Sequence, residues 1–208
     1  MLDTAFFDTL RIASVQWDLE PGHTDTRTRG GESIRIGFAQ PRWVGVVTIK
    51  SVAPRQMAPV KALLRALDQP GRYLLAHDPD HCGPLADPGG VILGAAEPKI
   101  ATLGGDGFSL TLSGLPAGYV LSVGDHIGWV YGSDPDRYAM HQLETSAVAN
   151  GAGVTGEIRV VPAIRPGVTA QTPVNLVRPK IKCTLSKRMG VSRALADSPV
   201  ITLTQTLR

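Results

Sequence analysis

The second half of the chain consists of short segments in which apolar and polar residues alternate. Phe108, Leu110 and Leu112 alternate with serine and threonine, and a glycine- and proline-containing turn follows at 114–118. Because successive side chains of a strand point to opposite faces of a sheet, this alternation is typical of strands with one buried face. Turns rather than helices separate the segments, so the sequence predicts a mainly β fold, an antiparallel β-sandwich or barrel.

Strands are also expected in the N-terminal part. Residues 10–17 alternate imperfectly, as a strand with one irregularity would. Ile34, Ile36 and Phe38 alternate strictly after a glycine turn at 30–31, and the segment 43–50 is expected to pair with them across Gln40–Pro41. Further strands are expected at 72–76, 120–123, 127–130, 138–148, 157–161, 174–177, 181–185 and 201–207.

One segment has the periodicity of a helix. Its apolar residues recur at 3.6-residue spacing, and Pro70–Gly71 ends the pattern. We therefore expect one α-helix over about 57–68 that flanks the β core and packs an apolar stripe on it. The stripe consists of Met57, Val60, Leu64 and Leu67.

The segment 77–106 is dense in proline, glycine and aspartate. A stretch of this length and composition predicts a long loop or flap that serves as a contact arm for a partner and has no core of its own. We expect a single β-rich domain, 1–208, into which this loop is inserted.

The charges show no cluster typical of a nucleic-acid-binding surface. The 21 Lys and Arg residues against 18 Asp and Glu leave a net charge of +3, without a run of five like charges. The densest basic group is expected to be a solvated strand face. It comprises Lys180, Lys182, Lys187 and Arg188.

Neither a membrane span nor a secretory leader is expected. No apolar run approaches the roughly 18 residues of a span, and residues 1–4 lack a basic and an apolar region. We expect a chain that is soluble when made, with Cys82 and Cys183 as reduced thiols.

The segment His77–Cys82 contains two histidines, two aspartates and a cysteine, which are ligand types that zinc uses. All of them lie in one short loop that contains a proline, and the sequence shows no second cluster that would complete a tetrahedron. We expect a polar loop here and assign no metal ligand. Metal binding by this loop is the alternative.

Residues around His126 and His141 have the types needed for general acid–base catalysis. The acidic ones are Asp125, Asp134, Asp136 and Glu144. Co-occurrence of such common residues is weak support, and the chain contains no nucleophile elbow, Walker loop, dinucleotide fingerprint or HExxH. We assign no catalytic and no cofactor-binding residue, and we expect no cofactor.

Two further features predict structure rather than chemistry. The glycine-rich segment Gly104–Gly107 precedes a strand and not a helix, so a tight turn is expected instead of a phosphate loop. Trp17, Trp43 and Trp129 lie in strand patterns and are expected in the core or in subunit contacts, whereas stacking on bases or sugars is the alternative.

Three stretches resemble the distal tail and related tail-tip proteins of siphophages: VGDHI at 123–127, YAMHQL at 138–143 and GEIRVVPAIR at 156–165. In that family a Gly-Asp hairpin introduces a strand and a second strand follows. A strand ending in Pro-x-hydrophobic-Arg then leads to a proline-bearing return, here 174–179. The resemblance covers about residues 107–185. The succession of strands and helix over 37–67 also looks like the tail-tube fold, in pattern rather than in motif.

The resemblance implies a non-enzymatic structural protein of the virion, located at the tail tip and assembled in the host cytoplasm. It implies a homo-oligomer, a hexameric ring that joins the tail tube protein to the hub or fibres. DNA would pass through the lumen without specific binding, past an acidic rim at Asp134 and Asp136, with the basic group on outer or inter-ring surfaces. A nucleic-acid-binding β-barrel and a hydrolase with a dispersed active site are the alternatives.

Overall fold

The computed structural model describes residues 2–50, 53–188 and 198–207, apart from the side chains of residues 54, 187 and 188. The chain is mainly β with antiparallel sheets, as the sequence predicts. Its contacts divide it into two compact units. The first unit comprises Met1–Thr9, Tyr73–Lys182 and Leu207–Arg208, and the second comprises Leu10–Arg72 and Cys183–Thr206. That residues 1–208 form a single domain stays a prediction.

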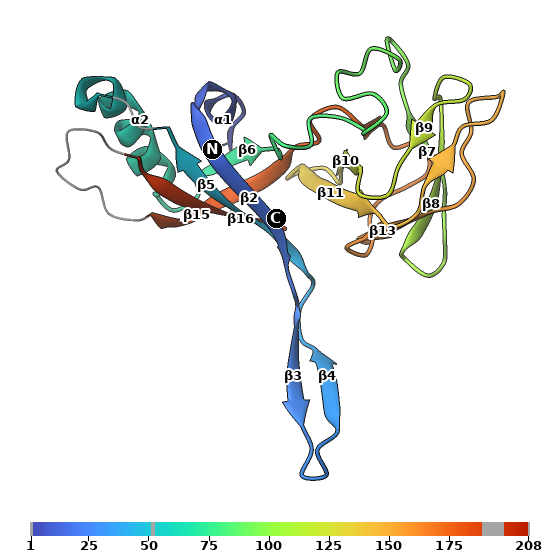
Figure 1. The fold of residues 1–208 in the computed structure, drawn as a ribbon, viewed down its shortest axis with the longest axis horizontal. Coiled ribbons are helices and arrows are strands. Elements are labelled where there is room, and N and C mark those ends of the chain that lie inside the picture. The colour runs from blue at the N-terminus through green and yellow to red at the C-terminus, as the bar shows by residue number, and fades with distance from the viewer. Residues whose placement is uncertain (1, 51–52, 189–197, 208) are drawn as a thin grey trace. The chain divides into compact units, whose positions relative to one another are not determined.

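The second unit contains an antiparallel sheet with the strand order β15-β16-β5-β2 (Figure 1). These strands are β2 (Ile12–Glu20), β5 (Arg42–Ile49), β15 (Ile181–Arg188) and β16 (Val200–Gln205). Strand β2 carries a register shift between Ile12 and Ser14, which is the expected irregularity. One face of the sheet is buried, since Val47, Ile49 and Leu203 on alternate positions are at most 2% exposed.

The predicted helix is present as α2 (Pro54–Leu67). It begins three residues before the apolar stripe. Pro54 occupies its first position, where proline is well tolerated, whereas Pro59 lies inside the helix. Met57, Leu64 and Leu67 are buried while Leu63 is 46% exposed, so the stripe faces the interior of the second unit as expected.

A two-stranded hairpin extends from this sheet (Figure 1). It consists of β3 (His23–Arg27) and β4 (Ser33–Gly37), paired from His23↔Gly37 to Arg27↔Ser33. The expected partner of the 33–38 strand was therefore wrong. The glycine turn folds β4 directly back on β3, whereas the segment 43–50 forms β5 between β2 and β16.

The first unit is organised by a sheet with the order β14-β10-β11-β13-β8-β7. The strands are β7 (Lys99–Leu103), β8 (Ser109–Ser113), β10 (His126–Tyr131), β11 (Arg137–Leu143), β13 (Ile158–Val161) and β14 (Val174–Asn175). An isolated bridge between Lys99 and Pro173 connects the two ends of this order, so the sheet nearly closes into a barrel. Its interior contains Ile100, Leu112, Ile127, Trp129 and Ile158, all at most 3% exposed.

Short elements complete the first unit. Strand β1 (Leu2–Asp3) pairs in parallel with β6 (Tyr73–Ala76), α1 spans Phe6–Thr9, and β9 (Val120–Leu121) pairs with β12 (Ala147–Val148). The expected long strand 138–148 is thus divided between β11 and β12. Neither helix of the described part is long and apolar enough to cross a membrane.

The predicted loop 77–106 is shorter than expected. Residues 77–98 contain no helix or strand, but 99–103 form β7, and Ile100 is fully buried in the core of the first unit. The loop itself is also attached to this unit, because the buried carboxylate of Asp87 accepts hydrogen bonds from the Leu93 amide at 2.8 Å and the Tyr119 hydroxyl at 3.2 Å. The expectation of an arm without a core of its own was therefore wrong for its C-terminal part.

Lys180 and Lys182, the two members of the basic group whose side chains the structure describes, do not form a solvated strand face. Lys182 is only 7% exposed, and its ammonium lies 4.8 Å from the centre of the Tyr73 ring, a cation–π contact. Lys180 donates to Asp8 at 2.8 Å and lowers the pKa of that carboxyl. The side chains of Lys187 and Arg188 lie outside the described residues.

Truncation of the helix stripe tests this packing. Leu64→Ala should lower the free energy of unfolding by about 2–5 kcal/mol, because it removes a buried side chain and leaves a cavity. Leu63→Ala on the same helix is the matched control and should change it by less than about 1 kcal/mol. Urea denaturation of both variants provides the measurement. Equal losses would show that the two helix faces are buried alike.

Candidate functional site

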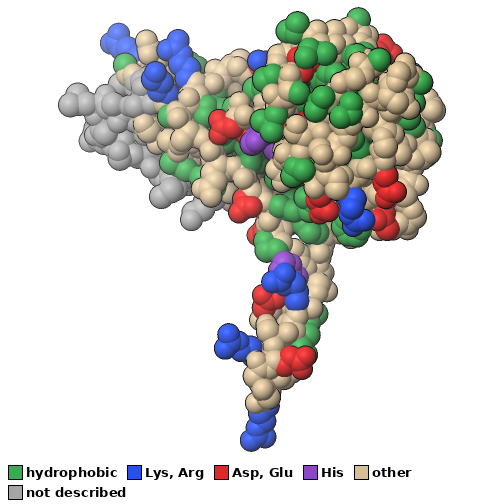
Figure 2. All heavy atoms as spheres, turned by 45° about the vertical axis from the view of Figure 1, so that its right-hand side comes forward, with side chains coloured by type: hydrophobic (Ala, Val, Ile, Leu, Met, Phe, Trp, Pro, Cys, Tyr) green, Lys and Arg blue, Asp and Glu red, His purple; other side chains and the backbone are tan. Residues whose placement is uncertain are grey.

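Among the described residues of the second unit, the β3–β4 hairpin is the most exposed part. All residues from 24 to 40 are exposed, and neither strand has a second hydrogen-bonded neighbour among the described strands. At about 3.4 Å per residue, the five residues of β3 span roughly 17 Å. Figure 2 shows side chains of both charges and apolar side chains along this arm.

A bulge at the base sets the direction of the hairpin. The amides of Phe38 and Ala39 both donate to the carbonyl of Gly22, at 2.8 and 3.0 Å, so two residues of one strand face one residue of the other. A Cβ atom at Gly22 would lie 1.9 Å from the Ala39 carbonyl oxygen. Glycine is therefore required at this close approach of the two strands.

One face of the hairpin is apolar. Ile34, Ile36 and Phe38 lie on it with exposures of 43%, 50% and 70%, opposite Thr26 and Thr24 of β3. The expected alternation is present, but its apolar face points into solvent instead of into a core. On the other face Arg35 and Asp25 form a bidentate ion pair at 2.8 and 3.1 Å, which lowers the pKa of Asp25.

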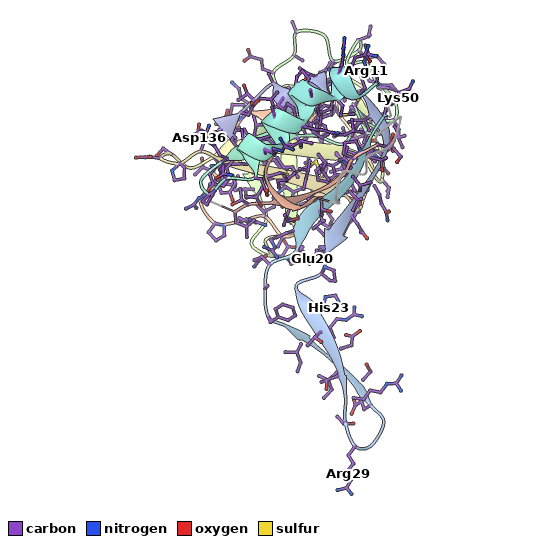
Figure 3. All side chains as sticks on the ribbon, turned by 90° about the vertical axis from the view of Figure 1, so that its left-hand side faces the viewer. Arg11, Glu20, His23, Arg29, Lys50 and Asp136 are labelled. Atoms are coloured by element: carbon purple, nitrogen blue, oxygen red, sulfur yellow. The ribbon has the colours of Figure 1, made fainter. Side chains whose placement is uncertain are left out.

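The tip of the hairpin carries basic side chains. Arg27 and Arg29 are exposed there, with Arg29 at the far end of the arm in Figure 3. The Thr28 hydroxyl accepts a hydrogen bond from the Glu32 amide at 3.1 Å and closes the turn. The exposed arginines are therefore held on an ordered turn.

A second site lies in the first unit, where the loop after β6 meets β10. Asp78 and His81 from the loop and His126 from β10 place their ligand atoms within 4.8 Å of one another. Asp78 and His126 are 5% and 4% exposed, whereas the His81 side chain is 40% exposed. Desolvation lowers the pKa of His126 to about 4, so its imidazole is neutral at pH 7.

The rest of the His77–Cys82 segment points elsewhere. His77 faces Asp8 at 3.4 Å and contacts the Phe7 ring edge, and burial lowers its pKa. The Cys82 thiol donates to the Pro79 carbonyl at 3.2 Å. Both cysteines are free, and burial raises the pKa of Cys183.

Sequence reasoning missed the partnership of this loop with His126. The sequence shows no second cluster of ligand types, whereas in the structure a single histidine on a strand provides the third candidate ligand. No sequence signal connects residues 81 and 126, because only the tertiary fold brings them together. The structure thus joins two candidate sets that the sequence treats separately.

The structure separates His126 from His141. His141 is the register partner of Ile127, and His126 is the partner of Gln142, so the two histidines point to opposite faces of the β10–β11 ladder. His141 stacks on Trp129 at 4.4 Å, and its Nδ1 lies 2.8 Å from the Pro162 carbonyl oxygen. They do not form the acid–base pair that was considered.

The neighbouring acidic residues have structural or exposed positions. Asp125 is 1% exposed, and its carboxylate accepts from the amides of Ser122 at 2.7 Å and Leu85 at 2.8 Å. Asp134 and Asp136 are exposed in the β10–β11 turn, and Asp136 points outward in Figure 3. Glu144 is exposed and pairs with Arg159 at 3.6 Å.

The glycine-rich segment and the tryptophans have structural roles. Gly104–Gly107 forms the turn between β7 and β8, in which the Asp106 carboxylate accepts from the Phe108 and Ser109 amides. Trp43 and Trp129 are buried, and Trp17 is half-buried with its ring against Gly45. These observations agree with a tight turn and with core positions.

The first unit also has a groove of about 760 Å³ beside β10 and β14. Its lining is mostly apolar or glycine, and Glu97 and Lys180 are its charged residues. Lys180 already binds Asp8.

No protein-family model and no curated protein sequence matches this chain. The geometry of the hairpin and of the histidine cluster is therefore the structural basis for inferring its function.

The buried His141 predicts acid sensitivity. Desolvation lowers its pKa to about 4, below the ordinary value of 6.5, so the unfolded chain binds this proton more readily than the folded one. The stability that comes from burying neutral His141 should be fully present above pH 6.5. It should be lost as the pH decreases toward 4, so the free energy of unfolding should fall over this range. His141→Gln should reduce this slope in urea titrations at several pH values, and an unaltered slope would contradict the assignment.

Asp125 predicts how the 77–98 loop is held. Asp125→Ala leaves two amides without their acceptor and should destabilise the protein by about 1–3 kcal/mol. Hydrogen exchange at Leu85 should accelerate. Asp136→Ala in the exposed turn is the control and should alter neither quantity. An unchanged Leu85 exchange rate would show that another contact holds the loop.

Proposed function

We propose that this protein is a structural subunit of a homo-oligomeric ring, a distal tail or tail-tip protein of a long-tailed bacteriophage. The observation that carries the proposal is the free β3–β4 hairpin with its exposed apolar face. Its family assignment rests on the sequence resemblance over 107–185.

An isolated hairpin of this kind is marginally stable in water. The hairpin exposes three large apolar side chains on one face, and neither of its strands pairs at its outer edge with another described strand. Such edges and faces are sites of strand addition or packing by another chain. A second protein surface that covers Ile36 and Phe38 would bury these side chains and thereby stabilise the hairpin.

A second copy of the chain is the partner that suits this geometry. The arm leaves its own sheet at a bulge that requires Gly22, so it is positioned to reach outward. Contact between the arm of one copy and a different surface of the next is heterologous, and such contacts close into a ring when the rotation is suitable. We propose about six copies, the number that the resemblance implies.

In this ring the DNA channel would be lined by groups that do not hold phosphate. The exposed Asp134 and Asp136 turn supports an acidic rim. Lys180 and Lys182 are also consistent with a lumen that does not hold phosphate. Lys180 forms an ion pair with Asp8, and Lys182 lies over the Tyr73 ring. In the assembled tail, the ring would connect the tail tube protein to the hub or fibres.

A ring predicts that the apolar face of the hairpin is needed for assembly. Ile36→Ser combined with Phe38→Ser should leave a folded monomer, since both side chains are exposed in the single chain. Light scattering and negative-stain microscopy should show rings of about six copies for the unaltered protein and monomers for the variant. Val91→Ser, 85% exposed in the other unit, is the matched control and should still assemble.

A monomeric unaltered protein at high concentration, or rings formed by the double variant, would contradict the proposal. The nucleic-acid-binding alternative rests on Arg27 and Arg29 at the hairpin tip. It predicts DNA affinity that falls steeply with salt and is reduced by Arg29→Ala, whereas the ring proposal predicts assembly that is insensitive to this change.

A further inference from the structure

We propose that Asp78, His81 and His126 form a binding site for a divalent transition-metal ion of the zinc class. One coordination position would remain for water or for a group of another molecule. This inference concerns the first unit alone and does not depend on the proposed ring.

The distances between the ligand atoms are close to those of a metal site. Asp78 Oδ2 lies 2.7 Å from His81 Nδ1 and 3.9 Å from His126 Nδ1. The two imidazole ring centres are 4.7 Å apart. With metal–ligand bonds of about 2.0 Å, tetrahedral ligands lie about 3.3 Å from one another. The ligand atoms all lie within 4.8 Å of one another, so an ion would fit between the carboxylate and the two rings after adjustments of up to about 1.5 Å.

The ligand types select the class of ion. Two imidazoles and one carboxylate are typical of zinc and related transition metals, whereas magnesium and calcium prefer oxygen ligands. Three protein ligands leave an open position, as in zinc sites that bind a water molecule.

The site is held by the fold before any ion arrives. His126 is fixed by its strand, where it pairs with Gln142. Asp78 is oriented by its second oxygen, Oδ1, which accepts the Asp80 amide at 3.0 Å, and the His81 amide donates to the Asp78 carbonyl at 3.2 Å. Supporting hydrogen bonds of this kind orient metal ligands in proteins.

Burial and access also suit a cation. The Asp78 side chain is only 7% exposed, so its carboxylate oxygens are shielded from water at this site. The partly exposed His81 provides an entry path from solvent. An ion bound here would neutralise the carboxylate and connect the 77–98 loop to the barrel-like sheet.

Titration of the chelator-treated full chain with Zn²⁺ tests the site, with Co²⁺ as a spectroscopic probe of coordination. We expect one ion per chain, with an absorption spectrum of four- or five-coordinate Co²⁺ and a melting temperature that rises with Zn²⁺. His81→Ala should weaken binding by at least about 10–100-fold, the loss typical even of an outer-shell partner. Because His81 is partly exposed, this variant should remain folded.

Three further variants complete the test. Asp78→Asn keeps the shape of the side chain and should also lose the ion. His23→Ala, in the hairpin, is the matched histidine control and should bind as the unaltered protein does. Cys82→Ser should bind normally, because its thiol faces the Pro79 carbonyl.

Three results would overturn the proposal. The first is a Kd for Zn²⁺ weaker than about 1 mM in the unaltered protein. The second is equal affinity in the His81→Ala variant. The third is loss of binding in Cys82→Ser, which would replace this ligand set by another.

Discussion

The alternation of side chains along antiparallel strands is the constraint on which this structure depends. In β10 it directs Ile127 and Trp129 into the core of the first unit and His126 to the opposite face. In β5 the same rule buries Val47 and Ile49. Both the hairpin face and the histidine cluster depend on which side of a strand a residue occupies.

The same rule shows how far a single sequence can be interpreted. Alternation and helical periodicity correctly predicted the mainly β fold, the antiparallel pairing and the helix stripe at Met57 and Leu64, since these depend on local pattern. They also predicted an apolar face at Ile34 and Ile36. They did not predict that this face is exposed, because burial depends on what lies opposite, and pairing of 33–38 with β3 rather than β5 leaves nothing there among the described residues.

The histidine cluster was beyond sequence reasoning for a related reason. Ligand spacing is informative when the ligands lie near one another in the chain, but His126 reaches Asp78 and His81 only through the fold. The loop also looked free of the core because its few apolar residues are short interruptions among glycine and proline. Its buried anchor Asp87 is polar, and composition cannot distinguish an anchoring aspartate from a solvated one.

The division of the chain between the units has a consequence for synthesis on the ribosome. The larger part of the first unit is one continuous segment, Tyr73–Lys182, inserted between the two parts of the second. Its barrel-like sheet can therefore close without any strand of the second unit. The second unit must wait, since β5 needs β16, and Trp43 and Gln205, which are hydrogen-bonded, stand 162 positions apart. Until β16 has been made, the β2–β5 pair and its hairpin lack this neighbouring strand. The exposed edge of β5 could then pair wrongly with another nascent chain on the same mRNA.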